Sequence, residues 1–177
     1  NLTESGYSDN MPIWSKDGKM MAWSSTREGA YGENRGAISR DIYAMFFTRE
    51  AYDSFRLTEE EYELLKEKEK KEKEEGEKDE DSKKKKKNNE EEGDDEIEDL
   101  KFELDNIDDR KERLTVHTSS ISDYALSSDG DKLYYITRFE GRNNIWLTDL
   151  RSNDTEIFAK ITARSASMEM SKEGDFL

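Results

Sequence analysis

The chain has 177 residues, of which 41% are charged and 32% are hydrophobic, and its formal net charge is −15 at pH 7. This acidic balance argues against nucleic acid as a partner, because phosphate binding needs a basic surface. The absence of cysteine excludes disulfide bonds and thiolate chemistry. No apolar run approaches the roughly 20 residues that cross a bilayer, so we expect no membrane span.

The negative charge is concentrated in one stretch of the chain. Residues 59–99 contain 11 Lys and 21 acidic residues, a net charge of −10. The other residues comprise 18 basic and 23 acidic side chains, which is ordinary for a soluble domain. We therefore interpret the acidic stretch as part of an insertion into a globular fold.

A short pattern occurs three times: an apolar residue, Ser, any residue, an acid and Gly, followed after two variable positions by another apolar residue. The copies begin at Trp14, Leu126 and Met170. An acid followed by Gly tolerates the positive φ of a tight two-residue turn, and strand-forming residues flank it, so each copy predicts a β-hairpin. The 44 residues from Gly130 to Gly174 match one four-stranded propeller blade, about 40–45 residues in the WD40 type.

In chain order, residues 1–115 are predicted to form the first blade. Its strands are expected at 11–14, 19–25, 41–47 and 111–115. A polar loop at 26–40 precedes the third strand, and an insertion at about 48–101 follows it. The fold class is therefore all-β, a partial β-propeller of four-stranded antiparallel blades with a helical, highly charged insertion in the first blade.

The insertion begins with helical signals. Tyr52 and Phe55 lie at helical spacing, and Thr58 with Glu61 has the arrangement of a capping box. These residues predict a helix that starts just after Thr58 and ends in the low seventies. Residues 76–99 have a single apolar side chain, so we expect them to be disordered or only marginally helical.

The second blade is predicted to be uninterrupted and to occupy residues 116–162. Its strands are expected at 122–126, 132–137, 144–149 and 155–161. Residues 163–177 are expected to begin a third blade with its first hairpin. These boundaries lead us to expect that the chain is a segment of a larger propeller protein.

Two features carry a resemblance to known proteins. The Trp-Ser-x-Asp-Gly hairpin and the later Asp41-Ile42-Tyr43 strand resemble the TolB-like, WD40-like propeller repeat. The order of strand, helix, Lys/Glu-rich tract and the segment 102–115 is similar to the bacterial tricorn-protease homologues. Those are large serine peptidases of the C-terminal-processing class, with N-terminal propellers, a PDZ domain and a catalytic core.

This resemblance implies a non-catalytic β-propeller segment of a tricorn-like serine protease, which binds or gates substrate peptides and acts as a scaffold. Its implied partners are peptides or unfolded polypeptides and the remaining blades and protease domains of the parent. The implied location is periplasmic or secreted, with a cytoplasmic location as the alternative. Two other functions stay open: a TolB-like protein-interaction scaffold without protease activity, and the propeller of a prolyl-oligopeptidase-like enzyme.

No catalytic, cofactor-binding or metal-ligating residue is assigned. His117 is the single histidine and is interpreted as a loop or strand-end residue, because catalysis needs a nucleophile and an orienting acid in geometric reach. Asp129 and Asp131 are interpreted as turn residues, because a calcium loop of the EF-hand type continues to a bidentate Glu that is missing here. We therefore expect no cofactor.

Two further groups have a structural interpretation. The glycines of the 26–40 loop are Gly29, Gly32 and Gly36. No Lys-Ser or Lys-Thr follows them, so they do not form a phosphate loop. The aromatic residues predicted in strands include Trp14, Trp23, Tyr135 and Trp146. Blades bury such residues between sheets, so we expect them in the core.

A partial propeller leaves one face of each terminal sheet without a neighbour, and large apolar patches rarely stay exposed. We therefore expect one of two outcomes. Either the chain associates with itself, or the insertion helix covers an open face. The helix residues expected to do so are Tyr52, Phe55, Tyr62 and Leu65.

Overall fold

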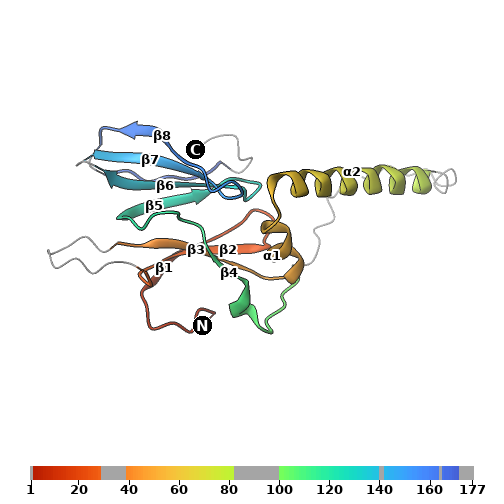
Figure 1. Cartoon of the computed structure of the whole chain (residues 1–177), viewed down its shortest axis with the longest axis horizontal. Helices are drawn as coiled ribbons and strands as arrows, with labels where there is room; N and C mark the ends of the chain where they lie inside the picture. The colour runs from red at the N-terminus through yellow and green to blue at the C-terminus, as the bar shows by residue number, and fades with distance from the viewer. Residues whose placement is uncertain (1, 29–38, 82–99, 140–141, 164, 172–177) are drawn as a thin grey trace, which may run out of the picture.

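The computed structural model describes residues 2–28, 39–81, 100–139, 142–163 and 165–171 (Figure 1). These residues form two antiparallel four-stranded sheets, which confirms the all-β fold class. Sheet 1 has the order β1(Asp9–Trp14), β2(Met20–Ser25), β3(Asp41–Phe46), β4(Lys111–Arg113). Sheet 2 has the order β5(Ile121–Leu126), β6(Lys132–Phe139), β7(Arg142–Asp149), β8(Thr155–Ile161). Every predicted strand up to residue 161 is therefore present, with small shifts at its ends.

The insertion between β3 and β4 is helical, as predicted. It contains α1(Arg49–Phe55), α2(Glu59–Asp81) and the 3-10 helix η1(Ile107–Arg110). The capping box is confirmed: the Thr58 amide donates to Glu61 Oε2 at 3.0 Å, and the Glu61 amide donates to Thr58 Oγ1 at 3.4 Å. No helix in the described part of the chain is long and apolar enough to cross a membrane.

Helix α2 is longer than its apolar pattern predicted. It continues to Asp81, so residues 76–81 are helical. Glu and Lys are strong helix formers and make favourable i,i+4 pairs, which sustains a helix whose sequence has no apolar stripe beyond Leu65. Residues 82–99 lie outside the described residues, so their expected disorder stays a prediction. Gly29, Gly32 and Gly36 lie outside them as well.

The loop between β1 and β2 is wider than the predicted two-residue turn. The Ser15 amide donates to Met20 O at 2.9 Å, and the Gly18 amide donates to Ser15 O at 3.0 Å. Only the glycine takes the left-handed conformation, with φ of 69° at Gly18 and 74° at Gly130. The acid and the glycine of the pattern therefore serve different purposes in this loop.

The Ser and Asp of the pattern close the loop from inside. In the second copy, Ser127 Oγ accepts from the Lys132 amide at 2.9 Å and donates to Asp129. Asp129 Oδ1 in turn accepts from the Asp131 amide at 3.1 Å. Burial opposes ionisation of Asp129, but these hydrogen bonds outweigh it and lower the pKa of Asp129. The first copy has the same bonds through Ser15 and Asp17, which explains why the pattern repeats.

We predict that Ser127→Ala lowers the free energy of unfolding by about 1 kcal/mol, because one hydroxyl both accepts and donates in this loop. Ser128→Ala is the matched control and should change it by less than about 0.5 kcal/mol. Urea denaturation followed by tryptophan fluorescence measures both. Equal effects of the two substitutions would contradict the proposed closure of the loop.

The two sheets pack face to face, and their contact forms the main core (Figure 1). We call the contributing surfaces the inner faces. The inner face of sheet 1 presents Met20, Ala22, Ile42, Ala44 and Phe46. The inner face of sheet 2 presents Tyr124, Leu126, Leu133, Tyr135 and the partly buried Trp146. Tyr135 and Trp146 thus occupy the core that the sequence predicted for them.

The two inner faces are opposite sides of the repeated four-stranded unit, as corresponding residues show. Trp23 and Tyr135 each lie five residues after the hairpin glycine, and they pair across the sheet with Tyr43 and Trp146 respectively. Tyr135 and Trp146 point toward sheet 1, whereas Trp23 and Tyr43 belong to a second cluster on the other side of their sheet. The two sheets therefore pack head to tail: one face of the repeat meets the opposite face of the next repeat.

The outer face of sheet 1 is covered by the chain's own return segment, residues 100–110. Trp23, Tyr43, Met45 and Phe47 are buried there, and Ile107 packs against them. Figure 1 shows η1 on the side of sheet 1 that faces away from sheet 2. Buried Arg110 fixes this segment by donating from Nε to Phe46 O at 3.2 Å and to the carbonyls of Glu103 and Asp105.

Trp14 differs from the predicted core position, because its side chain is 52% exposed. It stacks on Phe47 at 4.9 Å between ring centroids and meets Phe102 edge-on at 6.3 Å. The cover formed by residues 100–110 thus stops at this edge of the sheet. Trp14 and Phe102 remain partly open to solvent as an aromatic ledge.

The insertion helices cover the end of the core, not an open sheet face. Tyr52 and Phe55 of α1 pack on Phe46, with ring centroids 5.7 and 4.7 Å away. The Tyr52 hydroxyl donates to Glu112 at 2.8 Å. The expectation that the insertion helix covers an open sheet face is therefore wrong for Tyr52 and Phe55, because Phe46 belongs to the inner face and directs α1 to the rim of the sheet contact.

After β8 the described chain crosses to the first strand of sheet 2. The Met168 amide donates to Asp123 Oδ2 at 2.7 Å. Among residues 163 and 165–171 no strand is present, and most of the predicted third hairpin lies outside the described residues.

Candidate functional site

His117, Asp129 and Asp131, which the sequence analysis considered for catalysis or metal binding, lie in loops between strands. His117 is exposed in the loop between β4 and β5. Its neighbour Thr118 donates to Asp41 at 3.1 Å and so contributes to a buried polar cluster. Asp131 pairs with arginine and lysine side chains. Across the described residues, no group of three or more His, Cys, Asp or Glu could hold a metal ion.

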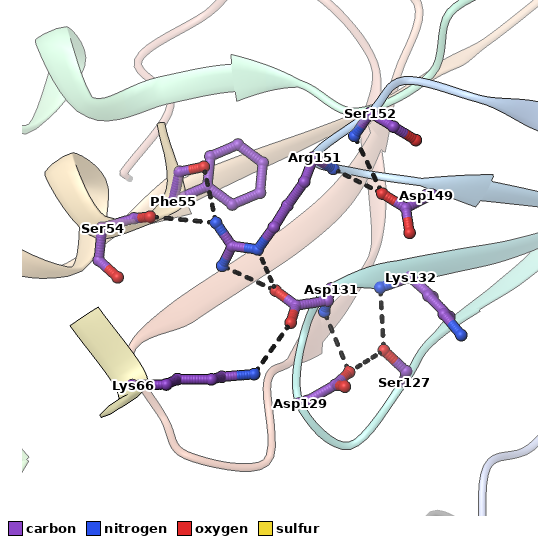
Figure 2. A network of polar contacts seen from close by, with 10 residues as sticks. All are labelled: Ser54, Phe55, Lys66, Ser127, Asp129, Asp131, Lys132, Asp149, Arg151 and Ser152. Carbon is purple, nitrogen blue, oxygen red and sulfur yellow. Dashed lines mark hydrogen bonds and ion pairs between the residues drawn. The ribbon is translucent and has the colours of Figure 1, made fainter. Parts of the chain in front are cut away.

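The densest polar contacts surround Arg151, in the turn after β7 (Figure 2). Its Nε lies 3.0 Å and its Nη2 2.8 Å from Asp131 Oδ1. Its Nη1 donates to Ser54 O at 3.2 Å and to Phe55 O at 3.5 Å. The side chain is only 8% exposed. We call Arg151, Asp131 and their partners the Arg151 hub.

The guanidinium of Arg151 also lies over an aromatic ring. Its central carbon is 3.2 Å from the ring centroid of Tyr62, near the start of α2. Lys66, one turn further along, lies 4.3 Å from the same centroid and 3.8 Å from Asp131 Oδ2. A cation over a ring face is attracted by the ring quadrupole. The hub therefore holds the first turns of α2 against sheet 2.

Hairpin loops of sheet 2 position the two charged partners. Asp149 Oδ1 accepts the amides of Arg151 and Ser152, both at 3.0 Å, which fixes the turn that carries Arg151. Burial opposes ionisation of Asp149, but these amides outweigh it and lower its pKa. The Leu150 amide donates to Asp131 O at 2.9 Å and joins the two loops. These backbone contacts thus join the two loops independently of the contacts that Arg151 and Asp131 make with the helices.

The geometry of the hub is suited to joining segments and not to bond chemistry. Arg151 satisfies carbonyls at the C-terminal end of α1, where helix carbonyls carry partial negative charge. Asp131 lies between Arg151 and Lys66, so its charge is balanced on both sides. General acid–base catalysis needs a group free to exchange a proton with substrate. Here the carboxylate and both cations are engaged within the protein.

A second polar cluster lies at the other end of β3. Asp41 has no exposed surface and accepts from Arg113 Nη2 at 2.7 Å, Thr115 Oγ1 at 2.9 Å and Thr118 Oγ1 at 3.1 Å. These bonds hold the segment that leads from sheet 1 to sheet 2. Nearby, burial and the charges of Glu28 and Asp41 raise the pKa of Tyr43 to about 12. Asp41 is therefore a fully compensated buried charge.

Sequence reasoning missed the residues of both clusters. Arg151 and Asp131 belong to hairpin loops that are separated by β6 and β7, and Asp41 and Arg113 lie on either side of the insertion. The available signal was the Asp-Gly loop itself, which places Asp131 directly after the turn glycine. Nothing in the local pattern shows which distant arginine faces it.

Comparisons with known proteins do not assign the chain. No protein-family model matches it, and a search of curated proteins gives no match. The functional interpretation therefore depends on the geometry described above and on the resemblance carried by the repeat.

We predict that Arg151→Ala lowers the free energy of unfolding by about 3 kcal/mol, because it leaves Asp131 partly buried beside Lys66 alone. Arg151→Lys should recover little of this loss, since an ammonium cannot reproduce the forked donors over a ring. Arg49→Ala is the matched control, because it breaks an exposed Arg–Asp pair and should cost less than about 1 kcal/mol. Urea denaturation and amide exchange of α1 measure the effects. Equal losses of stability for Arg151→Ala and Arg49→Ala would contradict the stabilising role of the Arg151 hub.

We also predict that deletion of residues 67–96 leaves both sheets folded. Lys66 lies just before the deleted stretch and pairs with Asp131 of sheet 2, so the deletion keeps this contact. A shorter connection changes closure entropy by only about 0.6 kcal/mol per twofold change in length. The near-ultraviolet circular dichroism and the cooperativity of unfolding should match those of the full chain. Loss of cooperative unfolding would show that the distal helix supports the fold.

Proposed function

We propose that the chain is a non-catalytic β-propeller segment made of two adjacent blades, with α2 as a charged arm at the rim. The observation that carries this proposal is the head-to-tail packing of two sheets that share one hairpin pattern and one strand order. A propeller is built by repeating one four-stranded sheet around an axis, so each contact joins opposite faces of the repeat. This relation distinguishes consecutive blades from two sheets related by a twofold axis.

The resemblance of the repeat and insertion extends the proposal to the parent protein. The segment would belong to a tricorn-like serine peptidase, periplasmic or secreted, in which it binds or gates peptides and supports the catalytic domains. The charged groups described above support a non-catalytic role, because Arg151, Asp131 and Asp41 are engaged in internal ion pairs and hydrogen bonds. A peptide-handling segment would bind unfolded polypeptide, whereas a scaffold would bind folded proteins, so binding experiments distinguish the two roles.

The experiment combines cleavage and binding on the purified chain. We predict no turnover of a quenched-fluorescent peptide library, and saturable binding of a fluorescein-labelled, reduced and carboxymethylated polypeptide by anisotropy. The folded, disulfide-intact form of that polypeptide is the control and should not bind. Turnover that His117→Ala abolishes would overturn the non-catalytic assignment. Binding of neither form would reject peptide handling and favour a scaffold for specific folded partners.

A further inference from the structure

Strand β8 forms a long edge of sheet 2 (Figure 1). It spans Thr155–Ile161, and in the described part of the chain it pairs with β7 and with no other strand. The corresponding edge strand of sheet 1, β4, has three residues, all of them charged, and the Tyr52 hydroxyl of α1 donates to its Glu112. A propeller leaves only short, protected edges. β4 follows that rule, and β8 departs from it.

Two apolar side chains on this edge are exposed, and they lie on opposite faces of the sheet. Ile157, 40% exposed, is opposite Trp146 of β7, which packs against the core, so Ile157 lies on the inner side. Phe158, 52% exposed, meets Tyr134 edge-on at 5.3 Å between ring centroids. Tyr134 lies on the outer face, because side chains alternate along β6 and its neighbour Tyr135 faces inward. A partner seated on one face would therefore cover only one of the two exposed side chains.

The backbone of β8 selects the kind of partner. Alternate residues of an edge strand direct their N–H and C=O groups away from the sheet, and another extended strand matches their spacing. A strand added beside β8 continues the β7–β8 ladder and brings side chains to both faces, where they cover Ile157 and Phe158. Unfolded polypeptide offers such a strand with free backbone groups, whereas folded proteins protect their edge strands.

The charged residues of β8 argue against a second copy of the chain as the partner. Glu156 is opposite Leu147, next to inward-facing Trp146, so it lies on the outer side of the sheet. Lys160 is opposite Asn144, two residues from Trp146, so it lies on the inner side. Two antiparallel copies of β8 would thus bring Glu and Lys to different faces and leave them unpaired. Each chain also carries a net charge of −15, so two copies repel each other.

We propose that β8 binds an extended segment of unfolded polypeptide by strand addition. The proposal rests on the peptide-handling role proposed above and names the binding site for it. Backbone hydrogen bonds give affinity with little demand on sequence, and the flanking Ile157 and Phe158 favour a segment with apolar side chains on both of its faces. Folded proteins bury such segments in their cores, so they become accessible when a polypeptide unfolds.

The first test measures the anisotropy of the fluorescein-labelled, reduced and carboxymethylated polypeptide with the full chain and three single variants. Phe158→Glu and Ile157→Glu alter the edge of β8. Phe102→Glu is the matched control, because Phe102 is 49% exposed, lies away from β8 and receives the same charge. We expect each β8 variant to bind about tenfold more weakly, equivalent to about 1.4 kcal/mol. Phe102→Glu should bind as the wild type does.

The second test isolates the backbone hydrogen bonds. A fluorescein-labelled peptide of alternating Val and Thr residues is compared with the same peptide N-methylated at every residue, which keeps the side chains and removes the N–H donors. The wild-type chain should bind the first peptide and not the second. Amide exchange of residues 155–161 should slow when the unmodified peptide binds, because the added strand engages N–H groups at the edge.

Several outcomes would overturn the proposal. Equal binding of polypeptide by the wild type and both β8 variants would reject this site and leave the proposed function standing, and so would equal binding of the two peptides. Wild-type dimers in analytical ultracentrifugation that Phe158→Glu abolishes would identify a second copy as the occupant of the edge. No polypeptide binding by the wild type would reject this site and peptide handling together. Circular dichroism and thermal unfolding confirm that each variant is folded, and the exchange measurement on the wild type depends on no variant.

Discussion

Burial of apolar surface on both faces of each sheet is the constraint on which the structure depends. A four-stranded sheet with apolar residues on both sides must cover two faces, and one contact between sheets covers one face of each. The inner faces meet each other. Residues 100–110 cover most of the outer face of sheet 1, and α1 closes the rim of the core at Phe46. The aromatic ledge marks the place where this local cover ends.

Polar clusters at the two ends of the sheets supply the directional contacts that apolar packing lacks. The Arg151 hub joins loops of sheet 2 to the helices of the insertion, and Asp41 joins sheet 1 to the linker before β5. Arg110 performs the same task for the return segment through backbone carbonyls. Hydrogen bonds require defined distances and angles. These residues therefore fix the position of each sheet relative to the segments that contact it, which apolar packing alone would leave free to slide. Each buried charge is compensated by several partners, which limits its desolvation cost.

The same arrangement connects the proposed function to the insertion. Arm α2 is held at its base, where Tyr62 and Lys66 meet Arg151 and Asp131. A partner that binds the arm would therefore act on the loops of sheet 2 and on the end of the sheet contact. A catalytic role would require free acid, base or nucleophilic groups in one place, whereas the charged side chains of these clusters are committed to holding the fold. A binding and scaffolding module is consistent with both features.

The sequence by itself determined the local elements, because they depend on neighbours in the chain. Strand positions followed from apolar residues around Asp-Gly, the start of α2 from the Thr58 capping box, and the fold class from the repeat. Only the tertiary structure decided that Trp14 is half exposed, that α1 closes the rim, and that Arg151 meets Asp131 and Tyr62. These contacts join residues from separate elements. Their distances are set by how the sheets stack, and no local periodicity encodes that.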